Sequence, residues 1–110
     1  MRCVKERLSE IMFGQINTDE IRMLMHKLAS ANIPYEAREW AGGYQVVYPD
    51  YGEEMVCSAI QHLGSYGGRD GYIEIMGLLT AEEEEYDSVK GWLTADEVFC
   101  RIEKHFKENT

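Results

Sequence analysis

Residues 35–52 read YEAREWAGGYQVVYPDYG, and this stretch decides the fold. Tyr35 to Trp40 and Tyr44 to Tyr48 are rich in aromatic and β-branched residues, which favour strands. Gly42-Gly43 between them is typical of a hairpin turn, and Pro49-Asp50-Tyr51-Gly52 reverses the chain a second time. The sequence therefore predicts an antiparallel meander that begins near residue 35.

The meander continues downstream, where residues 55–63 fit two patterns. Their apolar residues would form one stripe on a helix, but the same segment also alternates as a strand does, with Cys57, Ala59 and Gln61 on one face. The segment from Tyr72 to Met76 is a strand that requires a neighbour, with Ile73 and Ile75 on one face. We therefore favour a strand for residues 55–63.

A helix is predicted upstream of the sheet, because apolar residues recur there at i, i+3, i+4 and i+7. Asn17 is a suitable N-cap and Glu20 would complete a capping box. Asn32 can take the left-handed position at the end of the helix, and Pro34 prevents its continuation. The apolar stripe consists of Ile21, Leu24, Met25 and Leu28.

Residues 1–15 are expected to form a leader ahead of a single α+β domain at 16–110. One interpretation of the leader is an amphipathic helix. A second is that Met12 is the natural start, because Lys5-Glu6-Arg7 can be encoded by a purine-rich run that resembles a bacterial ribosome-binding site. The sequence leaves both interpretations open.

The last third of the chain contains two capping boxes, Thr80-Ala81-Glu82-Glu83 and Thr94-Ala95-Asp96-Glu97. Each belongs to a seven-residue echo that starts at Gly77 or Gly91, so the same entry into a helix is encoded twice. The first helix should end by Asp87 or Ser88 and the second should run from Ala95 to about Lys107. The predicted fold class is thus α+β, with an N-terminal helix, an antiparallel meander of about four strands and two C-terminal helices packed on one face of the sheet.

Composition narrows the class of function. The 110 residues carry a net charge of −9, a field that repels nucleic-acid phosphates, so we expect no direct nucleic-acid binding. No apolar run approaches the length of a membrane span, and three widely spaced cysteines do not suit a disulfide framework. We therefore expect a cytoplasmic protein without a membrane partner. No pattern indicates a cofactor.

The glycine-rich stretch from Gly64 to Gly71 is the first candidate site. Glycine backbone can present N–H groups to an anion, and an arginine can add a charged fork, so a nucleotide or another anion is a possible ligand. The glycine spacing matches neither a Walker loop nor a dinucleotide fingerprint, and a plain hairpin loop is the alternative. The candidate ligand-binding residues are His62, Ser65, Tyr66, Arg69 and Asp70.

Catalysis finds little support in the sequence. Ser65 or Cys57 with His62 and Asp70 could form a nucleophilic triad only if the fold brought them together, and no nucleophile elbow surrounds Ser65. If its face of the sheet were covered, burial would disfavour the charged form of Glu74 and make this carboxylate a candidate site residue. The acidic run at 82–87 lacks the alternation of an EF-hand, so no metal site is expected. We expect a protein that is not an enzyme.

The acidic run is the second candidate site, as a surface that docks on a basic protein groove. Acidic residues also suit the start of a helix, so a solvated capped helix is the plain alternative. Neighbouring aromatic side chains, including Tyr66, could serve as anchors. The candidate partner-binding residues are Glu82, Glu83, Glu84, Glu85, Tyr86 and Trp92.

A resemblance adds a context. Ser65-Tyr66-Gly67, the run GYIEIMGLLT at 71–80 and Leu93-Thr94-Ala95 resemble small prophage and mobile-element proteins of gut Firmicutes, over roughly Ile16 to His105. The resemblance implies a context and not an activity, and it assigns no residue a role. In that context, small acidic proteins without catalytic signatures are often inhibitors that block a host defence or nucleic-acid-handling protein. The sequence thus predicts a small acidic non-catalytic binding protein whose partner is another protein. A small-ligand binding domain that uses the Gly64–Gly71 loop is the alternative.

Overall fold

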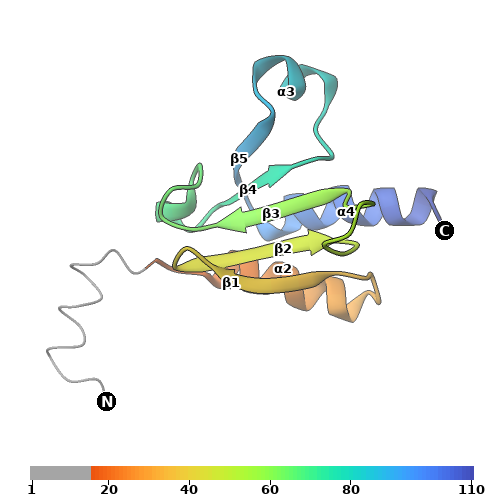
Figure 1. Ribbon diagram of the computed structural model, residues 1–110, viewed down its shortest axis with the longest axis horizontal. Helices are drawn as coiled ribbons and strands as arrows, with labels where there is room; N and C mark the ends of the chain where they lie inside the picture. The colour runs from red at the N-terminus through yellow and green to blue at the C-terminus, as the bar shows by residue number, and fades with distance from the viewer. Residues whose placement is uncertain (1–15) are drawn as a thin grey trace, which may run out of the picture.

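The computed structural model describes residues 16–110 and confirms an α+β fold (Figure 1). Its single sheet has the strand order β1-β2-β3-β4-β5, and every neighbouring pair is antiparallel. The two interpretations of residues 1–15 fall outside the described residues. The elements are α2 (Asp19–Ser30), β1 (Glu36–Trp40), β2 (Gly43–Tyr48), β3 (Cys57–Gln61), η1 (Gly68–Asp70), β4 (Ile73–Met76), α3 (Ala81–Tyr86), β5 (Val89–Leu93) and α4 (Ala95–Glu108).

The meander follows the sequence prediction, apart from the position of its first turn and the number of its strands. Residues 57–61 form a strand, as predicted, and Cys57, Ala59 and Gln61 lie buried on the same face of it. The hairpin turn lies one residue earlier than expected, at Ala41 and Gly42, whose φ angles of 52° and 83° both lie in the left-handed region. Two such residues form the tight turn that matches the twist of antiparallel strands, and Gly43 instead pairs with Trp40 in the ladder.

The sheet has five strands where the sequence predicted about four. The additional strand β5 pairs with β4, and the register shifts between Ile73 and Ile75. Its centre is Lys90-Gly91-Trp92, which lacks β-branched residues. Gly91 is required there because a Cβ atom would overlap Tyr66, which crosses the strand closely. The strand is therefore specified by its neighbours more than by its own residues.

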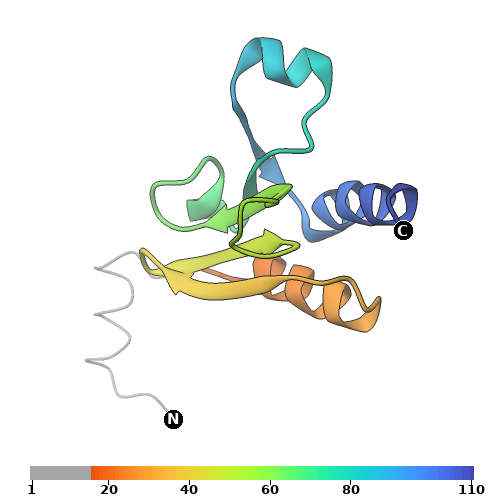
Figure 2. The same cartoon turned by 45° about the vertical axis from the view of Figure 1, so that its right-hand side comes forward.

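The hydrophobic core lies between one face of the sheet and the helices α2 and α4, which lie side by side behind it (Figures 1 and 2). The predicted stripe of α2 points inward, with Met25 only partly buried. The strands alternate, so their inward side chains complete the core. The fully buried aliphatic residues of this core are Ile21, Leu24, Leu28, Val46, Ile73, Ile75, Val98 and Ile102.

The start of α2 differs from the predicted capping box. Thr18 occupies the N-cap position, and the Asn17 side chain accepts a hydrogen bond from the backbone N–H of Asp19 at 2.8 Å. Glu20 does not close a capping box. Its carboxylate accepts the N–H of Ala95 at 2.7 Å, so it caps the first turn of α4, 75 residues away. The prediction was wrong because this partner is brought near only by the packing of α2 against α4.

The two C-terminal helices have the predicted limits and both predicted capping boxes. The echo extends to the backbone, since Leu78 and Trp92, at equivalent positions, both adopt positive φ, 55° and 61°. Their packing differs from the prediction. Helix α4 packs on the sheet, whereas α3 has no buried residue and lies beyond the β5 side of the sheet (Figures 1 and 2). Its six residues, four of them glutamates, supply no apolar stripe that the core could bury.

Candidate functional site

The connection between β4 and β5, residues 77–88, projects from the body of the protein and carries α3 (Figures 1 and 2). We call it the α3 arm. It includes the predicted acidic run and Tyr86. Leu78 and Leu79 at the root of the arm pack against the core, but α3 itself has no buried side chain, so polar contacts are needed to fix the position of the helix.

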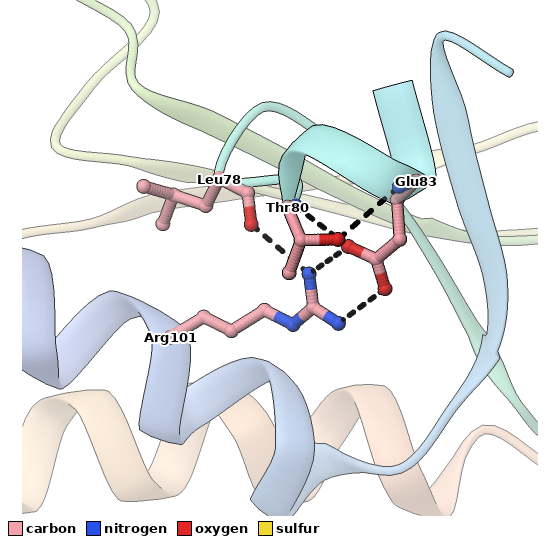
Figure 3. A network of polar contacts seen from close by, with 4 residues as sticks. All are labelled: Leu78, Thr80, Glu83 and Arg101. Atoms are coloured by element: carbon pink, nitrogen blue, oxygen red, sulfur yellow. Dashed lines mark hydrogen bonds and ion pairs between the residues drawn. The ribbon is translucent and has the colours of Figure 1, made fainter. Parts of the chain in front are cut away.

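Arg101 of α4 supplies such an anchor (Figure 3). Its two terminal nitrogens donate to both carboxylate oxygens of Glu83, at 2.7 and 2.8 Å, and one of them also donates to the carbonyl oxygen of Leu78 at 3.0 Å. The same Glu83 carboxylate accepts the backbone N–H of Thr80 in the capping box, at 2.9 Å. A paired arginine fork of this kind fixes direction as well as distance. Glu83 therefore joins the start of α3 to α4.

This arrangement changes the acidity of Glu83. The hydrogen bonds from Arg101, and after them the bond from the Thr80 backbone, lower the pKa of Glu83 from 4.5 to about 2, against the opposing effect of burial. A carboxylate whose pKa is lower in the folded protein stabilises the fold above its ordinary pKa. The contribution of Glu83 is therefore complete above pH 4.5 and is lost as the pH falls through about 2.

We expect the Glu83 carboxyl to titrate near pH 2 in the native protein, with a midpoint that returns toward 4.5 in the Arg101→Gln variant. The amide of glutamine cannot donate a charged fork to both oxygens, so the main cause of the low pKa disappears. The measurement is an NMR titration of the side-chain carboxyl carbon in both proteins. Equal midpoints would contradict the anchoring role of Arg101.

Three aromatic side chains that the sequence singled out surround one hollow at the base of the arm. Tyr66, Tyr86 and Trp92 are exposed by 54%, 93% and 56%. All three line a hollow of about 430 Å³ together with Asp87, Val89, Lys90 and Gly91. Such exposure is unusual for aromatic residues, which contribute strongly to binding when a partner covers them.

A second, smaller hollow of about 300 Å³ adjoins the first and shares Tyr86, Val89 and Lys90 with it. Glu82 lines this side, one helical turn before Tyr86. Tyr86 thus lines both the aromatic hollow and a second hollow that Glu82 and Glu83 also line. Glu84 and Glu85 are exposed on the same helix, whereas Glu83 is engaged by Arg101.

The Gly64–Gly71 loop is held together by its own hydrogen bonds. The Ser65 hydroxyl accepts the N–H of His62 at 2.9 Å and donates to its carbonyl oxygen at 2.8 Å. The backbone N–H of Tyr66 donates to the carboxylate of Glu74, and several other N–H groups of the loop donate to loop carbonyls. These donors are therefore occupied before any anion approaches. Arg69 and Asp70 are exposed within the turn η1.

The residues considered for catalysis do not converge as a triad would require. The hydroxyl of Ser65 donates to a backbone carbonyl, and the Nδ1 atom of His62 accepts the N–H of Gly64 at 3.0 Å. Burial raises the pKa of the Cys57 thiol to about 12, so the reactive thiolate is scarce at neutral pH. Glu74 lies on the face opposite the helices, half-buried and bonded to Tyr66.

Sequence reasoning missed the side of the hollow that β5 forms. Val89 and Lys90 line both hollows, and their role depends on a strand that was not predicted. The available signal was the alternation of Val89, Gly91 and Leu93, of which the last two are buried.

No helix within residues 16–110 combines the length and apolar character that a bilayer crossing requires. In the same residues, no cluster of three or more His, Cys, Asp or Glu side chains is placed to share a metal ion. Comparisons of the chain with protein-family models, with curated proteins and with solved structures find no match.

Proposed function

We propose that this protein is a non-catalytic binding module that engages another protein through the α3 arm. The observation that carries the proposal is Tyr86, a large aromatic side chain left 93% exposed on a helix that is fixed to the body by Arg101. Exposing so much apolar surface on an ordered element gives no benefit to folding, whereas a partner that covers it gains binding energy.

Charge indicates the chemistry of the partner. Glu82, Glu84 and Glu85 are exposed on the same helix as Tyr86, and the chain as a whole carries a net charge of −9. A field of this sign attracts basic surfaces and speeds their association. Protein interfaces combine a polar, solvated rim with an apolar centre from which water is excluded. The glutamates would form such a rim, and the aromatic hollow would form the apolar centre. The partner we propose is therefore a basic protein with an apolar side chain that enters the hollow between Tyr66, Tyr86 and Trp92.

A basic groove on a protein is commonly a surface that handles nucleic acid. A compact acidic protein that covers such a groove would compete with nucleic acid and act as an inhibitor. We therefore propose a phage-type inhibitor of a host defence or nucleic-acid-handling protein, in keeping with the resemblance of the sequence.

The alternative is a small-ligand domain that binds a nucleotide or another anion at the Gly64–Gly71 loop. The exposed side chain of Arg69, next to Asp70, favours this alternative, because a guanidinium can bind an anion. The internal hydrogen bonds of the loop count against this alternative, because they occupy N–H donors that an anion would need. They therefore favour the α3 arm as the binding surface.

Photo-crosslinking tests the proposal directly. A photoreactive amino acid replaces Tyr86 in the full chain, and the matched control carries it at Met23, which is 43% exposed on α2. Both proteins are irradiated in a lysate of a gut Firmicute at low salt. We expect a crosslinked basic protein with the Tyr86 bait that the Met23 bait does not capture. Equal capture by both baits, or capture only at Met23, would remove the arm from the proposal.

A further inference from the structure

The two edges of the sheet are treated differently. At the β5 edge, the N–H of Trp92 donates to the carbonyl oxygen of Tyr66, so a loop of the same chain covers part of that strand. At the other edge, all five residues of β1 are exposed. An uncovered edge strand presents unpaired backbone N–H and C=O groups, which form a template for another strand.

The order of charged residues on β1 favours one register for pairing with a second copy of the same strand. A twofold axis perpendicular to the sheet would place β1 antiparallel to its copy and keep each face of the sheet on the same side. With the axis at Glu36, this residue would face its own copy, and with the axis at Arg38, two arginines would face each other. With the axis at Ala37, Glu36 of each copy faces Arg38 of the other. The strand is thus self-complementary in one register, with two opposite-charge pairs and no like-charge pair.

Arg38 is held in place for such a contact. Its Nε atom donates to Gln45 at 2.7 Å, and Gln45 donates to Ser58 at 3.0 Å. The guanidinium lies 5.7 Å from the ring of Trp40 and 5.2 Å from that of Tyr51. Within residues 16–110, no ion pair includes Arg38 and its hydrogen bond to Gln45 uses Nε, so neither terminal nitrogen is engaged by another described residue.

We propose that the protein forms a symmetric dimer through β1, with the two sheets joined into one and the axis at Ala37. Charged residues on an edge strand often prevent pairing. Here their order permits one register and penalises its neighbours, which is how a specific interface is encoded. The α3 arm lies beyond the opposite side of the sheet from β1 (Figure 1), so the dimer would carry its two arms at its far ends. The dimer is independent of the proposed function and would add avidity to it.

A charge-reversal experiment tests this register. Glu36→Arg and Arg38→Glu are made separately in the full chain, and the dissociation constants of the wild-type dimer, each variant and their equimolar mixture are measured by sedimentation equilibrium. Each variant alone places like charges opposite each other twice, so its dimer should be at least about tenfold weaker than the wild type. In the mixture both pairs become opposite again, and the heterodimer should return to within about threefold of the wild-type affinity.

The design separates specific pairing from overall repulsion. Glu36→Arg makes each copy less negative, so general electrostatics would strengthen its dimer, whereas the proposed register weakens it. Circular dichroism and thermal unfolding of each variant show that its fold is retained. A wild type that stays monomeric up to about 1 mM, a Glu36→Arg dimer as tight as the wild type, or a mixture without heterodimer would each overturn the proposal.

Discussion

Replacing Gly77 by alanine is expected to lower the free energy of unfolding by about 3 kcal/mol. Gly77 joins β4 to the α3 arm with a φ of +88°, where a side chain costs about 1 kcal/mol or more. A Cβ atom at this position would also overlap the backbone carbonyl oxygen of Val56, so the end of the sheet would have to shift. Urea denaturation, followed by circular dichroism, measures the loss.

Gly42→Ala is the matched control for this prediction. Gly42 has nearly the same φ, +83°, but a Cβ atom there meets nothing within 4 Å. Gly42→Ala should therefore lower the free energy of unfolding only by the cost of placing a side chain at positive φ, about 1 kcal/mol. Equal losses in the two variants would show that Val56 does not constrain the root of the arm.

Local chemistry explains the parts of the fold that the sequence predicted. The capping boxes at Thr80 and Thr94 involve residues three positions apart, so their geometry follows from the sequence alone. The same holds for the end of α2, where Asn32 adopts the expected positive φ of 57°. Alternation along the chain likewise predicted that residues 57–61 belong to a strand, β3.

The features that the sequence did not predict depend on residues distant in the chain. Glu20 is a suitable capping residue for its own helix, yet its carboxylate bonds to Ala95 of another helix. Strand β5 pairs with β4, and Gly91 lets Tyr66 approach it closely. Contacts of this kind join residues far apart in the chain, so they leave no repeating pattern in the sequence around Glu20 or Gly91.

In the candidate site, too, some features follow from the local sequence and others depend on residues distant in the chain. The sequence singled out Tyr66, Tyr86 and Trp92 as aromatic anchors, and the fold places all three around one hollow. It grouped Glu83 with its neighbours as part of a docking surface, but could not reveal that Arg101, 18 residues later, binds this carboxylate. Residue type predicted which side chains could bind, and topology decided which of them remain free to do so.

The largest effect on binding is expected from the exposed groups of the α3 arm. A variant that combines Tyr86→Ala with Glu82→Lys, Glu84→Lys and Glu85→Lys should bind the crosslinked partner about 100-fold more weakly than the wild type. Loss of a central aromatic anchor removes about 2 kcal/mol, and the reversed charges add repulsion against a basic surface. Glu83 is left unchanged, because its substitution would release the arm from Arg101.

Two controls separate this effect from net charge and from folding. Glu53, Glu54 and Glu108 are exposed and lie outside the α3 arm, so their replacement by lysine changes the net charge equally. That control should retain affinity within about threefold at moderate salt, where the field of distant charges is screened. Both proteins should remain folded, because none of the replaced side chains is buried. The arm variant should unfold at a slightly lower temperature than the control, since its lysines at 82 and 84 oppose the dipole in the first turn of α3.

The most direct test of the proposed function is isothermal titration calorimetry of the purified partner against the wild type, the arm variant and the charge control, at about 0.1 M and 0.5 M salt. We predict wild-type binding that weakens with salt, a loss of about 100-fold in the arm variant at the lower salt, and near wild-type affinity in the control. An arm variant that binds as tightly as the control would contradict the central claim that the α3 arm is the binding surface.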